Sequence, residues 1–135
     1  MNPLGGDYRV QARYFADLAV LGGETFTEHQ EELARAVLEA VLLVGLPPYN
    51  IEAAADGEET GVALAPAPGN NRALRVLWQQ DAAAVLHLRA DVCDAQQAAM
   101  NQTLRTILAA HRLWIEDGPL GEAPVVLGSH RPSVK

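Results

Sequence analysis

Residues 72–91, RALRVLWQQDAAAVLHLRAD, alternate apolar and polar side chains on either side of a polar centre, which predicts two short antiparallel strands. If a loop at 80–82 joins them, Trp78 lies opposite Ala84 and Val76 lies opposite Leu86. A register shifted by one residue would mix apolar and charged side chains on both faces, so the separating register is favoured. We therefore expect an apolar inner face and an outer face that carries Arg75, Leu77, Val85, His87 and Arg89.

Helices are predicted before and after this segment. Residues 7–21 place their apolar side chains at helical spacing. In the second helix, Thr27 and Gln30 have the spacing of a capping box, and the helix is expected to end at Gly45, just before two prolines. The third helix is predicted over 95–115, with a long apolar stripe on one side.

The remaining segments complete the predicted fold. Residues 51–64 are expected to form a further hairpin, and 66–71 a loop, because prolines there lack the amide donor of a sheet ladder. The order helix, helix, four strands, helix favours an α+β fold with an antiparallel four-stranded meander and helices packed on one face. We expect a single domain over 1–118 and a C-terminal tail over 119–135, in which 125–127 can dock as a short edge strand.

Charge and cysteine content narrow the classes of partner and compartment. The chain has 135 residues and a formal net charge of −7, which disfavours binding to nucleic-acid phosphates. A single cysteine, Cys93, excludes an internal disulfide and fits a reducing compartment, so a cytoplasmic protein is expected. The longest apolar stretch, AVLLVGL, is too short to span a membrane, and the bias toward arginine and alanine is typical of a GC-rich bacterial genome.

Common catalytic motifs, such as HExxH, paired CxxC, a phosphate loop or GxSxG, do not occur in the sequence. Cys93 precedes a predicted helix, but the neighbouring aspartates disfavour a thiolate, so an inert cysteine is the simpler interpretation. His29 and Glu32 have a spacing that suits a pair of metal ligands, yet two ligands do not make a site. We therefore predict no catalytic residue, no metal site and no cofactor.

The predicted outer face admits three interpretations. Arg75, His87 and Arg89 could together hold a carboxylate or phosphate through charge-assisted hydrogen bonds. They could also be solvated and paired with acidic residues of the same chain. Leu77 and Val85 would leave an apolar spot among them, the sort of patch that a partner protein or a second subunit covers.

A second candidate site would lie between the sheet and the helices. Trp78, His111 and Trp114 are the residues that could line a small-molecule pocket there. Each of them also fits ordinary core packing, with the polar atom of the ring hydrogen-bonded to a neighbour.

The layout of helix, GLPP, strand meander and helix, together with the LVGLPPYNI junction, resembles the small acidic chaperones of type III secretion and the YbjN-like domains. The resemblance implies a dimeric or protein-binding α+β fold. The glycine- and leucine-rich internal signatures of those chaperones are missing from this chain.

The leading hypothesis is a non-enzymatic interaction module that binds a protein partner, as a homodimer, through the outer sheet face or the long last helix. The alternative is a small-molecule-binding protein or small enzyme with a pocket near Trp78, Trp114 and His111. Anion or nucleic-acid binding through the arginine face is a third hypothesis, and no membrane association is expected.

Overall fold

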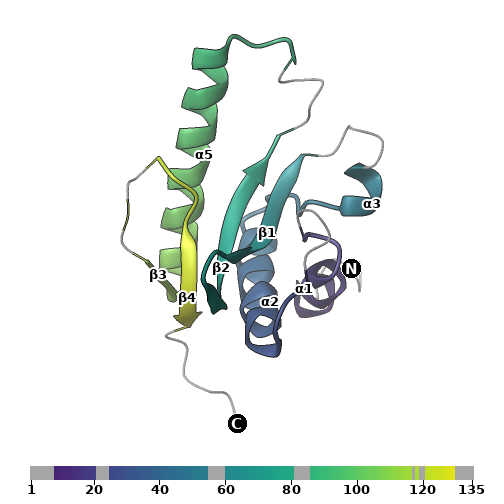
Figure 1. Cartoon of the computed structure of the whole chain (residues 1–135). Helices are drawn as coiled ribbons and strands as arrows, with labels where there is room; N and C mark the ends of the chain where they lie inside the picture. Colours follow the sequence, from purple (N-terminus) through teal and green to yellow (C-terminus); the bar gives the residue numbers. More distant parts are fainter. Residues whose placement is uncertain are drawn as a thin grey trace.

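The structure is a computed structural model that describes residues 8–20, 25–54, 60–80, 86–116, 118 and 121–129. Helices pack against a four-stranded antiparallel sheet with the strand order β1-β2-β4-β3 (Figure 1), which confirms the predicted α+β class. In chain order the elements are α1 (Tyr8–Ala16), α2 (Glu28–Leu43), α3 (Ile51–Ala54), β1 (Gly61–Ala67), β2 (Asn70–Gln79), α5 (Ala90–Ala110), β3 (Leu113–Ile115) and β4 (Val125–Ser129).

The predicted order of elements is wrong, because α5 separates the first two strands from the last two. The sheet is also not a meander, since β4 lies between β2 and β3. The residues of β4, expected as an edge strand in a tail, pair with β2 through Val126 opposite Leu74 and Val125 opposite Arg75. Val126 is fully buried, so burial of this short apolar run explains its inner position.

Local signals define both ends of α2, as predicted. The Thr27 hydroxyl accepts a hydrogen bond from the Gln30 amide at 3.2 Å, and the Gln30 side-chain oxygen accepts one from the Thr27 amide at 2.9 Å. At the other end Gly45 has φ 89°, and the amide of Leu46 donates to the carbonyl of Val41 at 3.0 Å. A left-handed glycine with this backbone hydrogen bond is a Schellman motif, which stops the helix.

Residues 66–71, predicted as a loop, instead form a tight turn and the strand residues on either side of it. Ala67 of β1 pairs with Asn70 of β2, so only Pro68 and Gly69 connect the strands. Gly69 has φ 73°, and proline followed by a left-handed glycine suits a type II turn. Pro66 is tolerated inside β1, next to an irregularity in the pairing with β2.

Residues 51–54, expected to begin a strand that pairs with β1, form the short helix α3, and 55–59 lie outside the described residues. Alanines make up much of this segment, and alanine favours helix over strand. On its other edge β1 makes single bridges with Val20 and Pro48. The approach is close at Gly61, where a Cβ would lie 2.7 Å from the carbonyl carbon of Pro48, so only a residue without a side chain fits.

Helix α5 begins where the second strand of the 72–91 hairpin was expected. Leu86 belongs to a helical turn, and Arg89 is the N-cap of α5, with φ −68° and ψ 150°. The prediction of a strand is therefore wrong for 86–89, and 81–85 lie outside the described residues. The neighbours of β2 are β1 and β4, and Val62, Leu64 and Val126, which lie opposite its inner-face residues, are fully buried.

The end of α5 also differs from the prediction, which extended it to residue 115. His111 is its C-cap, and Arg112 adopts a positive φ of 64°, which stops the helix. The next three residues form β3 and pair with β4. A three-residue strand is too short for its alternation to be distinguished from a helical stripe in sequence.

The hydrophobic core lies between one face of the sheet and the helices. Figure 1 shows α2 and α5 behind the sheet, and α1 packs against α2. The core takes large buried side chains from both layers: Leu33, Val37, Leu38, Val41, Val62, Leu64, Leu74, Val76, Leu104, Leu108, Leu113 and Val126. In α5 the buried residues all lie in the second half, so its first turns extend beyond the core. Among the described residues, no helix has both the length and the apolar character needed to cross a membrane.

Candidate interaction surface on the outer face of the sheet

The alternation of β2 places its side chains on the two faces that the sequence predicted. Leu74 and Val76 are fully buried against the helices, whereas Arg75 and Leu77 are half-buried and point the other way. Val125 shares the side of Arg75, because the two are directly opposite each other in β2 and β4. We call this side, with Arg75, Leu77, Val125 and Trp114, the outer face.

Trp114 joins the outer face from β3. Its neighbours Leu113 and Ile115 pack into the core, so Trp114 points to the opposite side, where it is 56% exposed. Its cross-strand partner is Gly128, and a Cβ there would lie 3.8 Å from the indole ring. The expectation that Trp114 lies on the buried stripe of the last helix is therefore wrong, because the helix ends before it.

The predicted basic patch is not formed. Arg75 lies opposite Ala65 and Val125, not opposite His87. His87 is exposed in the turn before α5. Val85, which was expected beside Leu77, lies outside the described residues.

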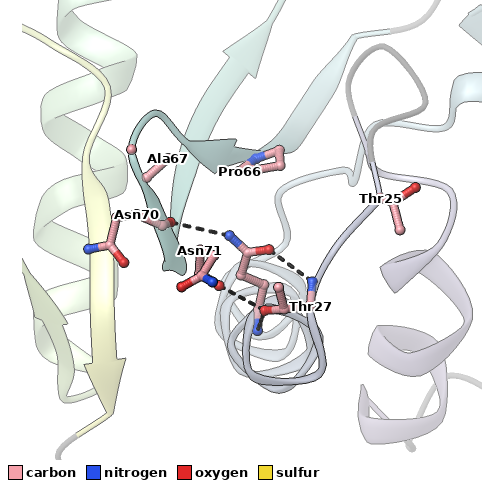
Figure 2. A pocket seen from close by; sticks show the side chains of 8 residues that line it. Thr25, Thr27, Pro66, Ala67, Asn70 and Asn71 are labelled. Carbon is pink, nitrogen blue, oxygen red and sulfur yellow. Dashed lines mark hydrogen bonds between the residues drawn. The ribbon is translucent and has the colours of Figure 1, made fainter.

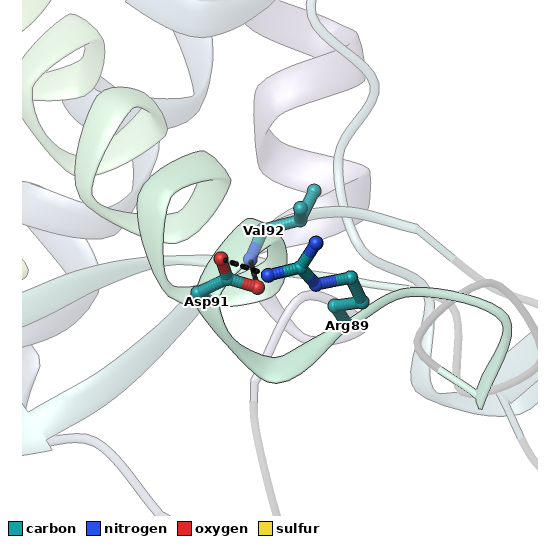
Figure 3. A network of polar contacts seen from close by, with 3 residues as sticks. All are labelled: Arg89, Asp91 and Val92. Carbon is teal, nitrogen blue, oxygen red and sulfur yellow. Dashed lines mark hydrogen bonds and ion pairs between the residues drawn. The ribbon is translucent and has the colours of Figure 1, made fainter.

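Arg89 lies at the start of α5 and pairs locally. Its guanidinium contacts the Asp91 carboxylate at 3.1 Å, and Asp91 also accepts a hydrogen bond from the Val92 amide at 3.0 Å (Figure 3). Both charged side chains are mostly exposed, and such pairs contribute little to stability. Arg89 is therefore part of a helix start and not of a shared anion site with Arg75.

A hollow of about 540 Å³ opens on the outer face. Its floor is apolar around Arg75, and its wall is the segment that leads into β4. The lining residues are Pro68, Arg75, Leu77, Asn101, Gly121, Glu122, Ala123 and Val125. The concave shape gives the outer face a place where a protruding side chain or loop can enter.

Two side chains of α5 hold the wall of this hollow in place. Asn101, which is 5% exposed, donates its side-chain amide to the carbonyl of Gly121 at 2.9 Å. Arg105 donates to the carbonyl of Glu116 at 3.1 Å and to that of Glu122 at 3.5 Å. These bonds tie the segment before β4 to a rigid helix, so the hollow is built by the fold rather than by a free loop.

The hollow carries one base and one acid that do not pair. Ion pairs within the described part of the chain join Arg35 to Glu31 and Arg89 to Asp91, and neither involves Arg75 or Glu122. No hydrogen bond of the Arg75 guanidinium to a described residue is present either. A half-buried guanidinium usually has a partner, since burying an unpaired charge is costly.

The predicted pocket between sheet and helices is not assembled from its three candidates. Trp78 packs partly against the core, and its carbonyl accepts a hydrogen bond from Gln97 at 3.0 Å. His111 caps α5, and Trp114 lies on the other side of the sheet. None of the three lines the outer-face hollow. Two other hollows lie where the start of α2 meets β2, and none of the three lines these either.

A second hollow, of about 560 Å³, lies between the start of α2 and the β1–β2 hairpin (Figure 2). Gln30, 2% exposed, donates to the carbonyls of Ala73 at 3.0 Å and Asn70 at 3.4 Å, and the Thr27 hydroxyl donates to the carbonyl of Asn71 at 2.8 Å. The buried polar groups are therefore already satisfied by the chain itself. These hydrogen bonds attach the start of α2 to β2, and the hollow lies beside them.

No cluster of three metal-ligating side chains occurs among the residues that the structure describes. His29 and Glu32 lie in the first turns of α2, and Cys93 is half-exposed in the first turn of α5. None of these brings together the nucleophile, base and donor groups that a catalytic site requires.

Sequence reasoning missed Asn101, Glu122 and Val125 as parts of the outer-face hollow. The composition of residues 125–127 predicts a short edge strand, but the pairing of this strand with β2 is a long-range contact that the composition does not indicate. The sequence carries no signal for the position of Glu122, which depends on the hydrogen bonds from α5.

The chain matches no protein-family model, no curated protein and no solved structure. The resemblance to type III secretion chaperones and YbjN-like domains therefore stays a prediction.

Proposed function

We propose that the protein is a non-catalytic interaction module that binds a protein partner and acts as a homodimer. The observation that supports this proposal is the outer face itself. In the part of the chain that the structure describes, α2 and α5 pack behind the sheet, on the side opposite this face (Figure 1). On the outer face Leu77 and Val125 line a hollow, and Trp114 is 56% exposed. An exposed tryptophan and a hollow with apolar lining residues on one sheet face are features of a face that another protein covers.

The first turns of α5 offer a separate surface for a partner protein. Leu86, in the turn just before α5, is 84% exposed, and Val92, in the first turn of α5, is 37% exposed. No residue of α5 before Asn101 is buried. This surface extends past the core and includes none of the residues that line the outer-face hollow. Two surfaces on one chain suit a module that self-associates and binds a partner at the same time.

Sedimentation equilibrium of the purified protein tests the homodimer. We expect a dimer at micromolar concentration, and Leu77→Asp should shift it to monomer because a carboxylate on the floor of the hollow would be desolvated. Leu86→Asp, in the exposed turn before α5, is the matched control and should stay dimeric. A wild-type protein that sediments as a monomer at high micromolar concentration contradicts the homodimer.

Site-specific photo-crosslinking in the native cell tests the partner. A benzoyl-phenylalanine at position 92, on the exposed start of α5, should give an adduct with one other protein. The same group at Arg35, which is exposed on α2, is the control and should not give that adduct. Identical adducts from both positions would show nonspecific contact and count against a dedicated partner surface.

A further inference from the structure

The outer face combines a base and an acid in a way that suits a second copy of the same chain. We propose that two copies pack outer face to outer face about a two-fold axis, with Arg75 of each copy paired to Glu122 of the other. This inference rests on the proposed homodimer and assigns its interface and its specific contacts.

The surroundings of Arg75 favour a partner from outside the chain. Arg75 is half-buried in β2 between β1 and β4, with Leu77, Val125 and Pro68 around it, and it has no acidic partner among the described residues. The chain has more acids than bases, 17 against 10, so a missing partner is not explained by a shortage of acids. An acid supplied from outside the chain would satisfy the guanidinium.

Glu122 lies in the same hollow, and it too forms no ion pair with any residue that the structure describes. Its backbone carbonyl accepts from Arg105 at 3.5 Å, and the adjacent Gly121 carbonyl is held by Asn101 at 2.9 Å. The backbone around residue 122 is therefore held against α5. An acid in a fixed place beside a base can act as a specific contact rather than a mobile surface charge.

Symmetry makes this arrangement self-complementary. In a two-fold interface, if residue i of one copy contacts residue j of the other, then j contacts i as well. One Arg75 and one Glu122 per copy thus give two equivalent ion pairs, with the apolar residues Leu77 and Val125 enclosed between them. The polar contacts would set the register, and the apolar floor would supply buried surface.

A free anion fits the hollow less well than a second copy does. Glu122 borders the same space as Arg75, so a phosphate or carboxylate ligand would meet a like charge. The chain also carries a net charge of −7, which disfavours anions in general. A symmetric mate brings one acid and one base together, which leaves the hollow neutral.

Charge-reversal variants test the pairing. Arg75→Glu leaves only acids in the interface contact, and Glu122→Arg leaves only bases, so each variant alone should raise the dimer Kd by about 100-fold or more. Mixed in equal amounts, the two variants should form a heterodimer, because every contact between the two different chains is then acid to base. The double variant Arg75→Glu/Glu122→Arg should dimerise with itself.

Sedimentation equilibrium measures all of these species, and circular dichroism checks that each variant is folded. Arg35→Glu, an exposed charge reversal on α2, controls for the change in net charge and should keep the wild-type Kd. If either reversal fails to fold, Arg75→Gln and Glu122→Gln replace it, and each should raise the Kd by about tenfold.

The outcomes separate this inference from the proposed function. A wild-type dimer whose two single variants stay monomeric when mixed, or whose single variants keep the wild-type Kd, overturns the Arg75–Glu122 pairing and leaves a homodimer with another interface. A wild-type monomer overturns both. Restored association in the mixture supports both.

Discussion

The contact between β1 and the segment that precedes α3 makes a quantitative prediction at Gly61. In Gly61→Ala the new Cβ would lie 2.7 Å from the Pro48 carbonyl carbon and the Tyr49 nitrogen, and 2.8 Å from the Pro47 oxygen. All three are backbone atoms, so no side-chain rotation relieves the contact. To reach an ordinary separation of 3.4 Å, the nearest atoms must retreat by about 0.7 Å.

That retreat acts on two hydrogen bonds of the same junction. The Val62 amide donates to the Pro47 carbonyl, and the Tyr49 amide donates to the Val62 carbonyl, each at 2.9 Å. A lengthening of about 0.7 Å takes both beyond hydrogen-bond distance, and each is worth roughly 0.5–1.5 kcal/mol. Alanine also restricts the unfolded chain, which offsets about 0.4–1 kcal/mol. We expect Gly61→Ala to lower the free energy of unfolding by about 1.3 kcal/mol, the middle of these ranges.

Urea denaturation followed by far-ultraviolet circular dichroism measures this change. The control is Gly118→Ala, because a Cβ there meets no atom within 4 Å. Hydrogen exchange adds a local readout, since the amides of Tyr49 and Val62 should lose protection in Gly61→Ala and keep it in the control. If Gly61→Ala stays within about 0.5 kcal/mol of wild type with both amides protected, the close contact is not a constraint on the fold.

Further stability predictions can be measured with the same denaturation assay. Gln30→Met should cost about 2–3 kcal/mol, because it leaves the buried Ala73 carbonyl without its donor while filling similar volume, and an unchanged midpoint would contradict this. Gly45→Ala should cost about 1 kcal/mol, since φ is 89° there, and a stabilised variant would contradict the helix stop. Leu104→Ala should cost about 2–5 kcal/mol, whereas Val92→Ala on the exposed start of the same helix should cost less than about 0.5 kcal/mol, so equal effects would mean that α5 is packed differently.

Local signals were sufficient to predict α2 and to predict which side chains of β2 point to the core. The capping hydrogen bonds between Thr27 and Gln30 form within one helical turn, and the positive φ of Gly45 is a property of that residue alone. Neither signal depends on a distant contact. The alternation around Arg75 likewise fixes which side chains point to the core, whatever strand pairs with β2.

Partners of each strand could not be predicted in the same way. The alternation within 72–91 distinguishes two pairings of that segment with itself and carries no information on pairing with β4, which lies far along the chain. The alanine-rich residues near 83 also have helix as an equally good local state. The outer-face hollow depends on those distant pairings, which is why Arg75 was identified and Glu122 was not.

The inner position of β4 has a consequence for synthesis on the ribosome. β2 leaves the exit tunnel long before residues 125–129 do, so one side of β2 must remain an unpaired edge while α5 and β3 are being made. Unpaired edges of this kind recruit strands from other chains. The sheet is therefore completed late, because β4 pairs with β2 only after residues 125–129 have been made, and β3, whose strand partner is β4, joins the sheet in the same step.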